Sequence, residues 1–150
     1  MRYWDEIEIG EKYTTPSRTI TEADVVMFGT LTGDFSPLHM DEEVAKSTVY
    51  GGRIAQGLMG LSYMEGMKLQ THFPVATMGS LGWTIRFCAT IRIGDTLTCH
   101  FEVAEKRETK KPDRGILVVA VQLLNQRGEV VQEGQHTRMI KRRVDASPAA

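Results

Sequence analysis

The hydrophobic pattern changes its period once along this chain, and that change constrains the fold more than any other feature. From Gln56 to Leu69, apolar residues recur at helical spacing and cover most of the helix circumference, with small residues between them. A helix that is apolar nearly all round must be buried. After Pro74, apolar and polar residues alternate instead, over 84–93 and again over 96–103, which is typical of strands. The pattern predicts an α+β fold, an antiparallel sheet wrapped around one long buried helix.

Further strands complete this sheet. The segment 116–124 is apolar on both faces, as expected of a central strand with both sides covered, and 130–141 is predicted to be the last strand. A short strand is expected near 12–17, and residues 144–150 are expected to form a loose tail.

Two further helices are predicted before the long one. Thr21 has the character of a helix N-cap, with an acid three residues on, and the helix that it opens is expected to end at Gly33. Asp41 is expected to cap a second, shorter helix that runs through Ala45 and Lys46.

Composition excludes several classes of function. With 150 residues the chain is expected to form one domain, 1–150, and its formal net charge of −1 gives no electrostatic case for nucleic acid or an anionic membrane. No apolar run is long enough to span a bilayer, and the acidic start shows no signal peptide. Cys88 and Cys99 are the only cysteines and lack the Cys/His spacing of a metal-ligand set, so we expect free thiols, no metal site and a cytoplasmic location.

One short stretch, Thr32 to Asp41, carries the candidate chemistry. Asp34 and His39 lie five positions apart on a segment that has the composition of a rigid turn, because it contains Gly33 and Pro37. A carboxylate and an imidazole held on a rigid turn suit proton transfer. On these ten residues alone, a purely structural interpretation is equally open: the acid caps the turn and the histidine is a buried, hydrogen-bonded residue.

The wider stretch, from Gly33 to Met59, resembles the signature of the MaoC-like dehydratases and (R)-specific enoyl-CoA hydratases, which are hotdog-fold enzymes acting on acyl thioesters. The family pattern is roughly Gly-Asp-x-Asn-Pro-x-His, followed by an Ile-x-His-Gly segment that opens the long helix. The residues that match in order and spacing are Gly33, Asp34, Pro37, His39 and Gly57. Two positions depart from the pattern: Ser36 stands where Asn is usual, and Gln56 stands where His is usual.

The resemblance implies a hydro-lyase of fatty acid metabolism that reversibly hydrates a trans-2-enoyl-CoA to a (3R)-3-hydroxyacyl-CoA. It implies that Asp34 and His39 are the catalytic pair and that the backbone N–H of Gly57 stabilises the thioester oxyanion. Ser36 and Gln56 would support the site, and we expect the Ser36 hydroxyl to hold the turn. No metal or other cofactor is expected beyond the coenzyme A of the substrate. Related enzymes are dimers, sometimes paired further, so a homodimer or higher homo-oligomer is expected.

Two other functions remain open at this point. The departures at Ser36 and Gln56 are compatible with a non-catalytic acyl-thioester-binding or partner subunit. A hotdog thioesterase would use a carboxylate to activate water for acyl hydrolysis. His72, His100 and His136 are interpreted as structural or exposed.

Overall fold

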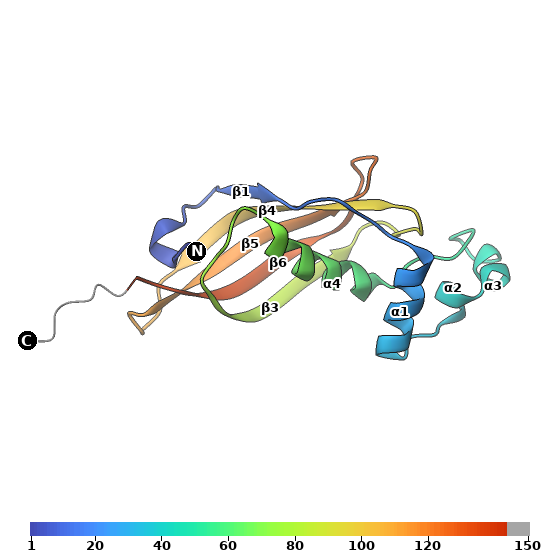
Figure 1. The fold of residues 1–150 in the computed structure, drawn as a ribbon, viewed down its shortest axis with the longest axis horizontal. Coiled ribbons are helices and arrows are strands. Elements are labelled where there is room, and N and C mark those ends of the chain that lie inside the picture. Colours follow the sequence, from blue (N-terminus) through green and yellow to red (C-terminus); the bar gives the residue numbers. More distant parts are fainter. Residues whose placement is uncertain (144–150) are drawn as a thin grey trace, which may run out of the picture.

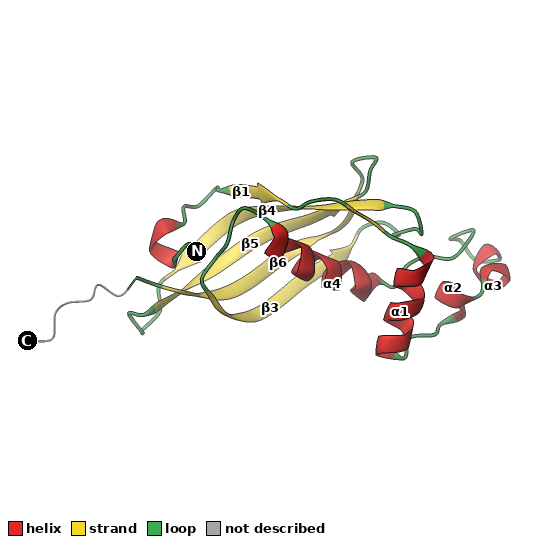
Figure 2. Cartoon of the chain, in the orientation of Figure 1, coloured by secondary structure: helices red, strands yellow, loops and turns green. Residues whose placement is uncertain are grey.

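The computed structural model describes residues 1–143, in which an antiparallel sheet packs against one central helix (Figures 1 and 2). The tail predicted for 144–150 lies outside the described residues. The strands are β1 (Lys12–Thr14), β2 (Arg18–Thr19), β3 (Thr77–Phe87), β4 (Thr96–Arg107), β5 (Arg114–Leu124) and β6 (Val130–Lys141). Their order is β1-β4-β5-β6-β3, with β2 also paired to β4, and every pair is antiparallel.

The helices divide into one that covers the sheet and three that lie at its end. They are α1 (Glu22–Thr32), α2 (Pro37–Met40), α3 (Glu42–Lys46) and α4 (Gly57–Met67), with 3₁₀ turns η1 (Trp4–Glu6) and η2 (Lys68–Gln70). In Figure 1, α4 lies across one face of the sheet, and α1, α2 and α3 gather at the end opposite the N-terminus. This arrangement confirms the predicted α+β architecture. Among residues 1–143, no helix is long and apolar enough to cross a membrane.

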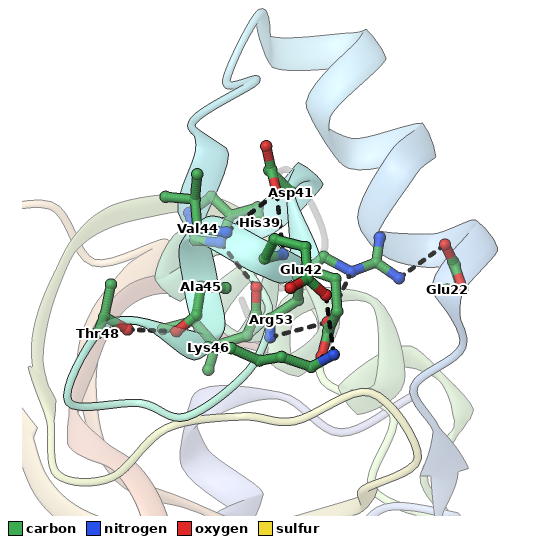
Figure 3. Close-up of polar contacts among 11 residues, drawn as sticks. Glu22, His39, Asp41, Glu42, Val44, Ala45, Lys46, Thr48 and Arg53 are labelled. Carbon is green, nitrogen blue, oxygen red and sulfur yellow. Dashed lines mark hydrogen bonds and ion pairs between the residues drawn. The ribbon is translucent and has the colours of Figure 1, made fainter.

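Local capping signals set the helix boundaries as predicted. The side chain of Thr21 accepts a hydrogen bond from the N–H of Asp24, whose carboxylate accepts one in return, so a complete capping box opens α1. Gly33 ends this helix in the left-handed region at φ 80°. Asp41 accepts hydrogen bonds from two backbone N–H groups in the first turn of α3 (Figure 3).

The predicted all-round burial of α4 is wrong for the single chain. Met59, Met64 and Met67 are buried against the sheet, which fits their interpretation as core residues. Leu58, on the opposite side of the helix, is 61% exposed. One chain therefore covers only one face of α4, although the sequence provides apolar side chains on nearly every face.

The strand predicted over 84–93 is displaced in the structure. β3 begins earlier, at Thr77, and ends at Phe87. Beyond that point, the N–H groups of Cys88 and Ala89 both donate to the carbonyl of Val131, so regular pairing with β6 stops. Ile91 is buried, but its carbonyl accepts a hydrogen bond from Ala55, in the segment that leads into α4. The alternation of Ile91 and Ile93 with polar residues thus reflects burial beside α4 instead of a continued strand.

Both cysteines are free thiols, as expected. Cys99 lies in the core, where burial raises the pKa of its thiol well above the usual range, whereas Cys88 is exposed.

A polar cluster lies between the last turn of α4 and the sheet, far along the helix from Gly57. His136, on β6, is 1% exposed and stacks on the Trp83 ring with 3.7 Å between ring centroids. Its Nε2 is 2.8 Å from the hydroxyl of Ser80, and its Nδ1 is 4.0 Å from the carboxylate of Glu65. Glu65 also accepts a hydrogen bond of 2.5 Å from Lys68, so this carboxylate pairs within its own chain.

The environment of His136 predicts a pH-dependent stability. Burial, and then the positive charges of Lys68 and Arg138, lower its pKa to about 3. Between about pH 6.5 and pH 3 the unfolded chain binds a proton that the folded chain does not, so stability falls as pH decreases through this window. The free energy of unfolding in urea, measured at pH 7.5 and 4.5, should fall less for His136→Gln than for the wild type. His100→Gln, an exposed control, should behave as the wild type; an unchanged pH dependence in His136→Gln would contradict the assignment.

Candidate active site

The turn that follows α1 places Asp34 at the end of the molecule where α1, α2 and α3 gather (Figure 1). The N–H of Gly33 donates to the carbonyl of Gly29 over 2.8 Å, which closes the helix before the chain reverses. Ser36 is extended, at φ −52° and ψ 135°, and Pro37 occupies the first turn of α2. Both conformations follow from the glycine and the proline, as predicted.

His39 projects from α2 and faces Asp34. The histidine is only 9% exposed, and its Nδ1 is 2.7 Å from the carbonyl oxygen of Ile54. A carbonyl can only accept, so Nδ1 carries the proton in the neutral ring and Nε2 is left as an acceptor. Nε2 is 3.8 Å from Oδ2 of Asp34, a separation at which one water molecule can contact both atoms. The carboxylate itself is 45% exposed, so solvent reaches the pair.

Gln56 links the turn that carries Asp34 to the start of α4. Its Nε2 donates to the carbonyl of Val25 at 3.2 Å and to the carbonyl of Asp34 at 3.4 Å, and the residue is 2% exposed. Gly29 makes this packing possible, because a Cβ there would lie 2.5 Å from Met40 and 3.1 Å from the Asp34 carbonyl. At the position where the family pattern has His, the glutamine thus holds the backbone of the turn.

An arginine fixes the neighbouring helices. Arg53 donates to Glu22 of α1 at 2.8 Å and to Glu42 of α3 at 3.3 Å (Figure 3). These ion pairs join both helices to the loop that leads to Ile54 and so support the segment that carries His39.

Among the described residues, no hydrogen bond of the Ser36 hydroxyl supports its predicted role of holding the turn. Ser36 is the N-cap residue of α2, but its hydroxyl accepts no capping hydrogen bond from the backbone N–H groups of this helix. The contact with Asp34 comes from the backbone N–H of Ser36, 3.4 Å from Oδ1. Any residue except proline would supply that backbone N–H. Serine in place of the usual asparagine therefore keeps this contact with Asp34.

The first turn of α4 presents unused donors. Neither Gly57 nor Leu58 donates its N–H to a protein acceptor among the described residues, and no side chain caps this helix end. A helix N-terminus with free N–H groups carries a partial positive charge that stabilises an oxyanion. A Cβ on Gly57 would lie 2.9 Å from the Phe87 ring, so only glycine lets the ring and the helix approach this closely.

A cavity of about 320 Å³ lies between His39 and the start of α4. Its wall includes His39 and Gly57, together with Tyr50, Ile54, Phe87 and Gln132, whereas Asp34 is not one of its wall residues. His39 and Gly57, 18 positions apart in sequence, therefore line one space that is large enough for a short acyl group. A larger cavity, of about 550 Å³, lies on the sheet between β1 and β6 and contains none of the predicted site residues.

Sequence reasoning missed the wall of this cavity. The sequence pattern places Phe87 only in a strand and gives no reason to single out Gln132. The available signal is weak, because Gln132 is one of several polar residues that follow two valines in this strand.

Known proteins of similar sequence carry consistent names. An (R)-specific enoyl-CoA hydratase from Rhodospirillum rubrum is 31% identical over 145 residues, which cover 95% of this chain and 94% of that protein. A 3-hydroxybutyryl-CoA dehydratase from Methylorubrum extorquens is 30% identical, over 99% of this chain and 90% of that protein.

Solved structures agree on the fold. A structure described as a monoamine oxidase regulatory protein from Archaeoglobus superposes with a TM-score of 0.87 at 36% identity, covering 94% of this chain and 95% of that one. A Mycobacterium tuberculosis protein described as a double hotdog fold, 19% identical, superposes with a TM-score of 0.82 over 99% of this chain and 47% of that one. The fold is thus a hotdog fold. The family model of the MaoC like domain matches residues 6–123, and the chain belongs to this family.

Proposed function

We propose that this chain hydrates the 2,3-double bond of a trans-2-enoyl thioester, giving a (3R)-3-hydroxyacyl thioester, and catalyses the reverse dehydration. The observation that supports this most directly is the shared cavity, which is lined by both His39 and Gly57, a residue whose N–H donates to no protein acceptor among residues 1–143. Hydration of a conjugated thioester needs both a proton-transfer group and an oxyanion donor.

The proposed reaction assigns each step to a group of this chain. The pair of Asp34 and His39 holds a water molecule, whose oxygen forms a bond to C3 as one of its protons passes to the pair. Negative charge then develops on the thioester oxygen, where the N–H groups of Gly57 and Leu58 donate. The pair returns one proton to C2, so it ends each turnover in the protonation state in which it began. No metal or redox cofactor enters this scheme, and coenzyme A enters only as part of the substrate.

The relatives' names suggest the first substrate to try. The Methylorubrum protein is named for 3-hydroxybutyryl-CoA, whose dehydration product is crotonyl-CoA. Absorbance of the enoyl thioester, followed together with a thiol reagent, separates the three candidate functions. Loss of the enoyl band without free thiol indicates hydration, and release of thiol indicates a thioesterase. An unchanged spectrum with crotonyl-CoA and with longer enoyl-CoAs would contradict the proposal and favour a binding subunit.

We further propose that the chain assembles as a homodimer through β3. This strand ends the sheet order, and it carries the exposed apolar side chains Met78, Leu81 and Phe87, beside the exposed Leu58 of α4. Exposed sheet edges with apolar side chains tend to pair. Light scattering at micromolar concentration should give the mass of a dimer. Leu81→Lys should shift this mass towards the monomer, whereas Leu31→Lys, on the exposed side of α1, should not; a monomeric wild type would refute the proposal.

A further inference from the structure

One buried amide joins the sheet to the start of α4. Gln132 lies on β6 and is 1% exposed. Its Nε2 donates to the carbonyl of Gly57 over 2.7 Å. This contact spans 75 positions of sequence and links β6, an inner strand of the sheet, to the first turn of α4, where Gly57 lines the cavity.

The helix is shaped to receive this amide. A Cβ on Gly60 would lie 2.5 Å from Nε2 of Gln132, so a larger residue at that position would push the amide off the helix. On the other side, the Phe87 ring lies against Gly57, and Phe87 is the cross-strand partner of Gln132 in the β3–β6 ladder. Two paired strand residues thus contact the start of α4, Phe87 through its ring and Gln132 through its amide.

Packing alone does not explain an amide here. Oε1 of Gln132 is buried and accepts no hydrogen bond from any residue of the described chain. An unbranched apolar side chain such as methionine would occupy similar volume without leaving a buried acceptor unpaired. The amide differs from methionine because it supplies a hydrogen-bond donor, and this donor fixes the position of the Gly57 carbonyl.

Resting on the proposed hydration, we propose that Gln132 is a positioning residue, which holds the N–H groups of Gly57 and Leu58 where the thioester oxygen develops its negative charge. A capping side chain would accept hydrogen bonds from N–H groups of the first turn. Gln56, at the N-cap position, makes no such hydrogen bond. Gln132 instead holds the turn through a carbonyl and leaves the N–H groups free. Donors aimed at a developing charge act mainly in the transition state, so this contact governs kcat more than KM.

The test replaces Gln132 by methionine and compares it with Gln122→Met, an exposed amide on β5. With crotonyl-CoA, Gln132→Met should lower kcat by about 10- to 100-fold, the range expected for a displacement of about 1 Å at a catalytic donor. KM should change less than about twofold, the melting temperature should stay equal or rise, and Gln122→Met should match the wild type. A melting temperature that falls in proportion to activity would overturn the proposal, because it would assign the amide to folding.

A spectroscopic measurement makes the result independent of turnover. The absorbance maximum of a bound dienoyl thioester shifts to longer wavelength when donors polarise its carbonyl. The wild type should show this shift and Gln132→Met should lose it. Gly60→Ala keeps the amide but displaces it, so it should lose the shift as well. If the wild type binds the thioester without hydrating it, the proposed function fails while the shift still decides the role of Gln132. An equal shift in all three proteins, or no binding by the wild type, overturns the inference.

Discussion

Replacing Asp34 by Asn, or His39 by Gln, is expected to slow hydration of crotonyl-CoA by about 10²–10⁴-fold, the usual contribution of a general acid–base group. The asparagine keeps the shape of Asp34 but cannot take up a proton. The glutamine can still reach towards the carbonyl of Ile54, which Nδ1 contacts at 2.7 Å, but it has no titrating ring. Initial rates at saturating thioester measure the effect. The double variant should lose much less than the product of the two single losses, because residues that act as a unit are not additive.

The control for this pair lies seven positions further along the chain from Asp34. Asp41→Asn keeps a side chain that can cap α3, so it should retain both stability and rate. The Asp34→Asn and His39→Gln variants should both melt within a few degrees of the wild type and still bind thioester. A purely structural role for the pair predicts the opposite, a clear loss of melting temperature with activity falling only as the protein unfolds. Folded, fully active variants would refute the assignment.

Gly134→Ala is expected to destabilise the fold by at least about 4 kcal/mol, a loss that only a few mechanisms produce. A Cβ at this position would lie 1.8 Å from the carbonyl oxygen of Thr84 and 2.8 Å from its carbonyl carbon, which are backbone atoms of β3. The two strands must separate to relieve the overlap. For a chain of this length, the melting temperature should fall by roughly 10 °C or more. Thermal unfolding followed by circular dichroism measures it.

A matched glycine in the neighbouring strand gives the control. Gly82 lies on β3, its φ is not positive, and a Cβ there would meet nothing within 4 Å. Gly82→Ala should leave the melting temperature within about 2 °C of the wild type, since substitutions away from close contacts have small effects. Equal losses in both variants would show that general strand propensity, and not backbone overlap at Gly134, sets the cost.

Local signals allowed much of the fold to be predicted. The capping residues Thr21 and Asp41 and the left-handed Gly33 each act within a few positions, and each is where the sequence indicates. The early part of β3 could not be predicted, because Gly79 and Gly82 have low strand propensity and only pairing with β6 makes them extended. The conformation of that segment depends on tertiary contact with β6, which no short-range sequence pattern indicates.

The candidate site shows the same division. Asp34 and His39 are five positions apart, so one turn brings them together and their spacing is informative. Gln132 reaches Gly57 only after the sheet has formed and set its register. Such a contact depends on the whole topology, and one amide in a strand sequence is too weak a signal to predict it. The residues proposed to transfer protons were therefore predictable, whereas the residue proposed to aim the oxyanion donors was not.

The different burial of the two cysteines makes the cavity accessible to selective thiol labelling. Cys99 is enclosed in the core, while Cys88 is exposed and forms part of the cavity wall that also contains His39. The described chain thus offers a single exposed thiol, which lines the same cavity as His39. A maleimide dye added to the unaltered protein is expected to label this position. Its fluorescence is expected to change when an acyl thioester occupies the cavity, with no engineered residue needed.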